Sequence, residues 1–455
     1  MSDKETLIAW DKRYLWHPFT QMNDWHEETP VIIARGEGCY LIDVDSNRYL
    51  DGTASMWTNV HGHNHPALNA ALKTQVDNIA HTTLLGYSNI PAIQLAKKLM
   101  ELTPSGLNKV FYSDNGSTAV EVALKMAYQY WQHKGQPQRK RFVHLDKAYH
   151  GDTIGAMSVG GIESFHQNFD ALLFNSIRVP APESARLQSP PPGRRCFQPP
   201  PTRTRCLNEI ERVLTEHATE IAGIIVEPLI QGAGGMLVAP EGLLKGIETL
   251  AQQHETLLIV DEVMTGFGRT GKMWACEHED VSPNLLCTAK GLAAGYLPLA
   301  ATLTTDEIYN AFLGEYRERK TFFHGHTFTG NPLACAVALE NIAIFEREHL
   351  LSRLQTTISH FQKRLQEFYQ LAHVGEVRAR GLAAGVELIK NPDTNEPYPL
   401  EEKVGIRVCR AALARGAMLR PLVNTIVLMP PLQISLSELD ALLDIVYRAI
   451  REVTE

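Results

Sequence analysis

The sequence predicts an α/β protein with a large domain built on a mostly parallel sheet and a smaller α+β domain. Between residues 66 and 330, short apolar runs alternate with helical periodicity, the order typical of parallel strands covered by helices on both faces. Several of these runs end directly in polar residues, and such sheets bind ligands beyond the carboxyl ends of their strands. We expect an N-terminal arm and small-domain segment (1–65), a large domain (66–330) and a C-terminal small domain (331–455).

Composition narrows the class of protein. The 455 residues carry 43 basic and 51 acidic side chains, a net charge of −8, without a long basic run, so no nucleic-acid partner is expected. No apolar run approaches the roughly 18 residues of a membrane span, and the chain starts without the apolar core of a signal peptide. Seven scattered cysteines without a CxxC pair favour a reducing compartment. These features predict a cytoplasmic protein with no membrane partner.

The N-terminal region contains three recognisable stretches. Residues 1–35 are polar with interleaved aromatics, which indicates an arm that is packed across a neighbour or loosely ordered. Two strands around a polar turn predict a hairpin over 36–52. Three alternating histidines follow, His61, His63 and His65, but no second ligand cluster accompanies them, so a metal site is not favoured.

The other elements follow from periodicity. In the large domain, helices are expected over 66–80, 91–102, 119–132, 207–217, 240–254 and 306–312, and strands over 109–112, 141–145, 221–227 and 257–260. In the small domain, helices are expected over 333–348, 352–371, 401–415 and from 437, and strands within 374–388 and over 417–422 and 425–429. Residues 183–206 are rich in proline and arginine and predict an exposed, extended or disordered loop without function.

A phosphate-binding turn is predicted between the strand at 109–112 and the helix at 119–132. Gly116 allows a ligand to approach the backbone closely, and Ser117 follows it. The free N–H groups and the dipole of the helix start favour an anion at this position. The alternative is an ordinary Ser/Thr helix cap.

Residues 257–291 suggest a cofactor site. A buried strand runs into Asp261, and a second apolar run ends at Lys290. Burial lowers the pKa of a lysine and leaves the neutral amine that attacks carbonyls. Such a lysine could hold pyridoxal phosphate (PLP) as a Schiff base, while the aspartate keeps its pyridine nitrogen protonated. Two polar residues that cap turns are the alternative, but Ser117 and Tyr149 also follow strand signals, which favours a shared site.

Four motifs resemble those of the class III (subgroup II) aminotransferases. They are Ser113-Asp114-Asn115-Gly116-Ser117, Tyr149-His150-Gly151-Asp152, the run from Asp261 to Arg269, and Ala289-Lys290-Gly291. Within this class, the chain is most similar to the 7,8-diaminopelargonic acid synthases of biotin biosynthesis, in segments 16–22, 60–66, 266–272, 275–278 and 324–327. The resemblance covers nearly the whole chain except 183–206. It implies the PLP-dependent transferase fold type I, PLP as cofactor, small-molecule substrates and a homodimer with shared active sites.

The resemblance also implies roles for individual residues. Lys290 would bind the cofactor aldehyde and carry protons, Asp261 would pair with the pyridine nitrogen, and Tyr149 would stack on the ring and line the substrate pocket. The phosphate would be held by Gly116 and Ser117, with His326 and Thr327 also at the cofactor and Thr327 reaching across from the partner subunit. Gly325 is expected near the substrate, and Arg420 would clamp the carboxylate of 8-amino-7-oxononanoate.

The amino donor is predicted from three positions of the substrate pocket. Enzymes of this group that use S-adenosylmethionine resemble one another in a tyrosine and a tryptophan pair, where this chain has Phe19 and Met56-Trp57. Members that use lysine are similar to this chain at these positions, so L-lysine is the hypothesis and S-adenosylmethionine the family's usual donor. The alternatives are a class III aminotransferase acting on ω-amino acids or diamines, and a PLP-binding regulator without turnover.

Overall fold

The computed structural model describes residues 4–182 and 203–455. Most of the stretch predicted as a loop over 183–206 therefore lies outside the described residues. The prediction is wrong for residues 203–206, because helix α9 (Arg203–Glu216) begins there.

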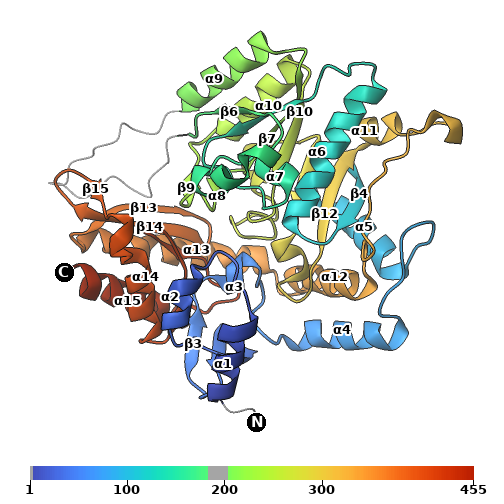
Figure 1. Cartoon of the computed structure of the whole chain (residues 1–455). Coiled ribbons are helices and arrows are strands. Elements are labelled where there is room, and N and C mark those ends of the chain that lie inside the picture. Colours follow the sequence, from blue (N-terminus) through green and yellow to red (C-terminus); the bar gives the residue numbers. More distant parts are fainter. Residues whose placement is uncertain (1–3, 183–202) are drawn as a thin grey trace.

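A seven-stranded sheet forms the centre of the molecule (Figure 1). Its strand order is β4 (Leu107–Ser113), β12 (Ala300–Thr305), β11 (Leu285–Thr288), β10 (Leu257–Asp261), β7 (Ile221–Val226), β5 (Arg141–Leu145) and β6 (Ile177–Val179). Only β12 runs against its neighbours, pairing antiparallel with β11 and β4. The predicted α/β class with a mostly parallel sheet is confirmed.

Helices cover both faces of this sheet, because alternate residues of the buried strands point to opposite sides. Leu257 and Ile259 of β10 pack in one hydrophobic cluster with α6 (Gly116–His133). Leu258 and Val260 face the opposite cluster. The second face is covered by α5 (Ile90–Leu102), α9, α10 (Leu243–Gln253) and α12 (Pro332–Arg347).

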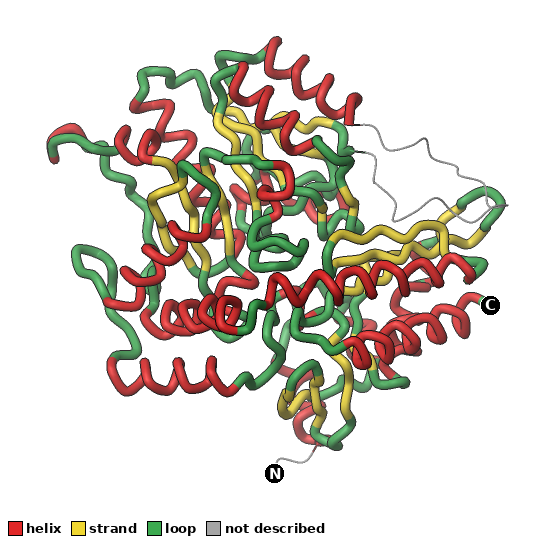
Figure 2. Tube along the Cα trace, turned by 180° about the vertical axis from the view of Figure 1, so that it is seen from behind, coloured by secondary structure: helices red, strands yellow, loops and turns green. Residues whose placement is uncertain are grey.

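A second sheet follows α12 in the chain and packs with three helices, as Figure 2 shows from behind. Its strands are β13 (Val374–Arg380), β14 (Ala383–Asn391), β18 (Thr425–Leu428), β17 (Pro421–Leu422) and the short β15 (Glu396–Pro397). The helices are α13 (Leu350–Leu365), α14 (Val404–Leu413) and α15 (Leu436–Thr454). This is the smaller α+β unit that the sequence predicts.

The N-terminal region, predicted to begin with a polar arm, forms regular helices and strands. It contains α1 (Lys4–Tyr14), α2 (Met22–Glu27) and the strands β1 (Ile33–Glu37), β2 (Tyr40–Asp43) and β3 (Arg48–Asp51). The β2–β3 pair is the predicted hairpin. β3 also pairs in parallel with β16 (Ala417–Met418). The single strand predicted over 417–422 is therefore wrong: β16 joins the N-terminal sheet, whereas β17 pairs with β18.

The remaining elements are short, apart from one helix. They are α3 (Ala54–Trp57), α4 (Pro66–Asn78), α7 (Ile154–Ser158), α8 (Glu163–His166), β8 (Ile230–Gln231), β9 (Leu237–Val238) and α11 (Asp306–Ala311). Within the described part of the chain, no helix combines the length and apolarity needed to cross a bilayer.

Candidate active site

A cavity of about 500 Å³ lies beyond the carboxyl ends of β7, β10 and β11. Six of the predicted site residues line it: Trp57, Gly116, Ser117, Tyr149, Asp261 and Lys290. The residues from Gly116 to Lys290 meet because parallel strands end at the same edge of the sheet, whereas Trp57 reaches the cavity from the segment after β3.

Asp261 is the last residue of β10 and is buried. Its Oδ1 accepts the N–H of Val263 at 3.0 Å, and its Oδ2 lies 2.7 Å from Nδ1 of the buried His150. The carboxylate accepts, so Nδ1 of His150 carries the proton. Sequence reasoning quoted His150 within a motif but missed this contact, which joins positions 111 residues apart.

Lys290 follows β11 and begins a 3₁₀ turn, Lys290–Ala293. Desolvation lowers the pKa of its amine, although Asp261 and Glu227 act in the opposite direction. Its Nζ lies 5.1 Å from the centroid of the Trp57 ring. A lowered pKa makes the neutral amine more accessible, and this is the form that acts as nucleophile or base.

The turn after Lys290 is held by Asn341 of α12, which is fully buried. Its Nδ2 donates to the carbonyls of Gly291 at 2.9 Å and Leu292 at 2.8 Å. Its Oδ1 accepts from Nε2 of His61 at 2.7 Å. Burial lowers the pKa of His61 to about 4, so this histidine is neutral. His61 thus supports the lysine turn, and the described residues contain no group of three or more candidate metal ligands.

Glu227 adds a second carboxyl group at the cavity, directly after β7. Burial first, and then the neighbouring Asp261 carboxylate, raise the pKa of its side chain to about 7, against the opposing effect of His150 and the hydrogen bonds that Glu227 accepts. Its oxygens accept the N–H groups of Tyr149 and Gly232, each at 2.9 Å. The sequence signal was present, since Glu227 ends a strand next to β10, but no role was predicted for it.

The start of α6 lies at the cavity, where the phosphate-binding turn is predicted. Asn115 and Thr118 cap the helix reciprocally, and Asn115, Gly116 and Ser117 line the cavity. The Ser117 hydroxyl accepts the N–H of Thr153 at 3.0 Å. A Cβ added at Gly116 would lie 2.5 Å from Cγ1 of Val263, so only glycine fits here without displacement. Helix N-terminal N–H groups beside a hydroxyl suit a phosphate.

Tyr149 and Phe19 lie in one row of aromatic rings. The Tyr149 ring is 6.1 Å from that of Phe165, and Phe165 is 5.2 Å from Phe19, between ring centroids. The carbonyl of Phe19 accepts from the exposed Arg420 at 3.3 Å. The Tyr149 hydroxyl donates to Asp152 at 2.8 Å. Phe19 and Arg420 do not line the Lys290 cavity itself; this row connects them to it.

The other predicted residues lie apart from the Lys290 cavity of this chain. Gly325 and His326 line a separate cavity of about 330 Å³. Nδ1 of His326 lies 2.7 Å from Oδ2 of Asp114, which directly precedes the turn at the start of α6. Thr327 and Met56 are exposed.

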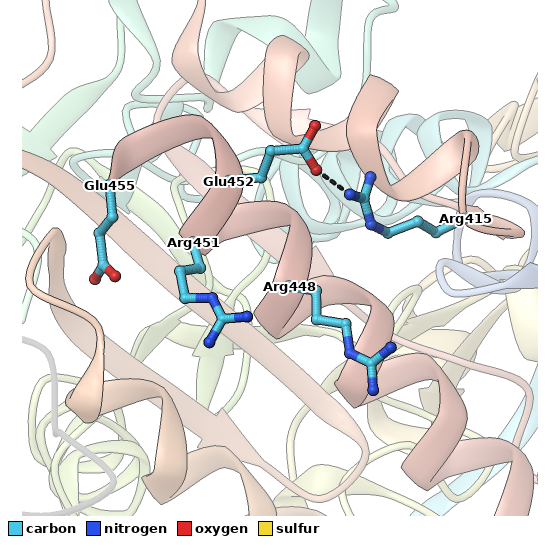
Figure 3. A pocket seen from close by; sticks show the side chains of 5 residues that line it. All are labelled: Arg415, Arg448, Arg451, Glu452 and Glu455. Atoms are coloured by element: carbon cyan, nitrogen blue, oxygen red, sulfur yellow. Dashed lines mark hydrogen bonds and ion pairs between the residues drawn. The ribbon is translucent and has the colours of Figure 1, made fainter.

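One further depression contains only charged side chains (Figure 3). Arg415, Arg448, Arg451, Glu452 and Glu455 line it, and Arg415 pairs with Glu452. All come from α15 and the turn after α14, so this depression is distinct from the cavity at Lys290.

Comparison with known proteins gives consistent results. The family model described as aminotransferase class-III matches residues 21–450. The adenosylmethionine-8-amino-7-oxononanoate aminotransferase of Geobacter sulfurreducens is 54% identical over 452 residues, covering 99% of each chain. That of Aquifex aeolicus is 51% identical, covering 99% of this chain and 98% of its own. The crystal structure of the Methanocaldococcus jannaschii enzyme of the same name is 47% identical, with a TM-score of 0.93 over 99% of both chains.

Proposed function

The chain belongs to the class III aminotransferase family, and from this membership we propose that it transfers an amino group to 8-amino-7-oxononanoate, giving 7,8-diaminononanoate in biotin biosynthesis. The observation that carries the proposal is the 54% identity over nearly the whole length to an enzyme of that name. The cavity with Lys290 opposite a carboxylate supports it.

PLP is the cofactor of class III aminotransferases, and the residues of the cavity fit it. Lys290 would bind its aldehyde, Asp261 its pyridine nitrogen, and Gly116 and Ser117 at the start of α6 its phosphate. When bound, PLP supplies an electron sink that stabilises negative charge on the substrate carbon.

The chain's own side chains would then position the bound molecules and transfer the proton. Lys290 would take a proton from one carbon and return it to another. His150 and the N–H of Val263 would keep the Asp261 carboxylate oriented. Trp57, buried beside Lys290, would exclude water from the amine. Arg420 would bind the substrate carboxylate through its planar, two-pronged guanidinium.

Two amino donors are candidates. The names of the relatives specify adenosylmethionine, and we propose it as the first candidate. Phe19 and Met56 favour L-lysine as the second. The test incubates the PLP-loaded enzyme with 8-amino-7-oxononanoate and each donor, and measures 7,8-diaminononanoate by mass spectrometry. Product with one donor and not the other settles the choice.

Other outcomes of the same assay contradict the proposal. Turnover only with ω-amino acids or diamines would indicate a different class III aminotransferase. Bound PLP without turnover of any amine would indicate a regulator.

The assembly is proposed to be a homodimer in which Thr327 completes the phosphate site of the partner. Gly325, His326 and Thr327 lie outside the Lys290 cavity of their own chain. Large exposed apolar side chains lie beside them: Phe323 shortly before Gly325 in the chain, and Leu85, which lines the same cavity as Gly325 and His326. Sedimentation should give twice the chain mass, and Thr327→Ala should weaken PLP binding. A cytoplasmic location and the domain boundaries at 65/66 and 330/331 stay predictions.

A further inference from the structure

The short element labelled α3, between β3 and the three histidines at 61, 63 and 65, is a left-handed turn without glycine. Four consecutive residues, Ala54, Ser55, Met56 and Trp57, have φ angles of 48°, 46°, 64° and 71°. L-amino acids disfavour this region because Cβ crowds the following carbonyl, and single residues rather than runs normally occupy it. Contacts from elsewhere must therefore maintain the turn.

Asp51, the last residue of β3, supplies these contacts and is 2% exposed. Its Oδ1 accepts the N–H groups of Thr53 at 3.3 Å and Ser55 at 3.0 Å. Its Oδ2 accepts the Ser55 hydroxyl at 2.7 Å and Nε2 of His63 at 2.9 Å. Burial opposes ionisation, yet the hydrogen bonds from His63 and Ser55 lower the pKa of the Asp51 carboxyl.

His63 is itself fixed at its other nitrogen. Its Nδ1 lies 3.1 Å from Nδ2 of Asn59, which donates, so Nε2 carries the proton that His63 gives to Asp51. Asn59 Oδ1 accepts the N–H of Gly62 at 2.7 Å. These hydrogen bonds therefore connect Asp51, which precedes the left-handed turn, with Asn59 and His63, which follow it.

The turn determines what faces Lys290. It buries Trp57 against Gly232 and Met264, where a Cβ added at Gly232 would lie 3.3 Å from Cζ3 of Trp57. The indole ring then stands 5.1 Å from the Lys290 amine. The preceding Met56 is left 44% exposed.

We propose that Asp51 is a positioning residue, which through Ser55 and His63 holds the left-handed turn that places Trp57 beside Lys290 and so shapes the amino-donor pocket. The kinetic consequence of this proposal rests on the proposed aminotransferase function. Its conformational consequence rests on the structure alone. Asp51 itself does not line the cavity.

The test compares Asp51→Asn with a matched control, Asp43→Asn. Asp43 ends the neighbouring strand β2, is also buried, and accepts Asn47, Asp45 and Tyr49 donors without touching residues 54–57. The first readout is hydrogen–deuterium exchange of the cofactor-free protein. In Asp51→Asn, amides of residues 55–59 should exchange at least tenfold faster than in wild type, while in Asp43→Asn they should not.

The second readout is the donor half-reaction, followed as the rate at which an amine bleaches the absorbance of the bound cofactor. Asp51→Asn should raise the donor concentration for half-maximal rate at least fivefold. Ala54→Gly in the same chain should restore part of it, because glycine adopts this φ without strain.

Three results would overturn the proposal: wild-type exchange at residues 55–59 in Asp51→Asn, equal changes in both Asp variants, or no recovery with Ala54→Gly. The exchange result involves no substrate, so it stands even if 8-amino-7-oxononanoate proves not to be the acceptor.

Discussion

His150 and Asp261 form a buried pair, with Nδ1 of the imidazole 2.7 Å from Oδ2 of the carboxylate. The pair lies in the cavity that also contains Lys290. The Val263 N–H donates to one oxygen of the carboxylate and the imidazole N–H to the other, and each oxygen can accept a further hydrogen bond.

Asp261→Asn should lower kcat at least about a hundredfold, the usual effect of removing one group that stabilises developing charge. Glu262→Gln is the control, because this neighbouring buried carboxyl bonds instead to Thr265 and the N–H of Cys276. Steady-state rates at saturating substrate, with circular dichroism for folding, check this. Comparable losses in both variants would argue against a specific role for Asp261.

Lys290→Ala should reduce turnover by about three orders of magnitude, since the proton-transfer group is lost. Borohydride reduction of the wild-type enzyme should attach the cofactor to the peptide that contains Lys290. Lys272→Ala is the control, an exposed lysine that donates to the Glu277 carbonyl. Labelling of a different peptide in the wild-type enzyme would refute the assignment.

Gly116→Ala should weaken PLP binding at least about tenfold, because the new methyl group meets Val263 and displaces the helix start from the phosphate. Adding Val263→Ala should recover part of the affinity by removing the colliding methyl groups. Fluorescence titration of the cofactor-free protein measures both. Unchanged affinity in the single variant would place the phosphate elsewhere.

Asn341→Leu should remove the donor to two carbonyls behind Lys290 and lower the unfolding free energy by about 2–4 kcal/mol. It should also lower kcat, because the lysine turn loses its support. Asn424→Leu is the control, since Asn424 likewise donates to a backbone carbonyl, that of Tyr398. Denaturant unfolding and kcat are measured for both; a kcat equal to that of the control would restrict Asn341 to stability.

Glu227 predicts a pH dependence of stability. Its folded-state pKa is raised from 4.5 to about 7, so between these values the folded protein binds the proton more strongly than the unfolded chain. This contribution is present below pH 4.5 and is lost as the pH rises through 7. As the pH rises from 4.5 to 8, the unfolding free energy of Glu227→Gln should increase relative to that of wild type by on the order of 2 kcal/mol. This is less than the full pKa shift would give, because the Glu227 side chain is partly accessible to solvent. Denaturant unfolding of both cofactor-free proteins at several pH values measures this difference. If the curves of unfolding free energy against pH run parallel for wild type and Glu227→Gln, Glu227 does not titrate in this window.

The sequence alone predicts the fold class, and it predicts that Gly116, Tyr149, Asp261 and Lys290 lie around one cavity. Each follows a strand or opens a helix, and parallel topology alone brings such positions to one edge. Their catalytic roles stay predictions.

Other features depend on contacts that no local pattern specifies. Asn341 meets the lysine turn from a helix 50 residues later, and its partner His61 is 280 residues away. The left-handed turn at 54–57 contradicts local preference, since none of its residues is glycine. Residues 417–422 read as one strand because their apolar content does not reveal which of two sheets each half will join.

The ladder between β3 and β16 has a consequence for how substrate choice can change. Met418 pairs with Asp51, and Gly52 donates to the Met418 carbonyl at 3.0 Å. Arg420 leaves one strand of this ladder and the Trp57 turn leaves the other. The segment that contains Arg420, the proposed carboxylate-binding residue, and the turn that contains Trp57 are therefore attached to the same two-stranded ladder. We predict that a mutation that shifts either strand changes the selectivity for donor and for acceptor together.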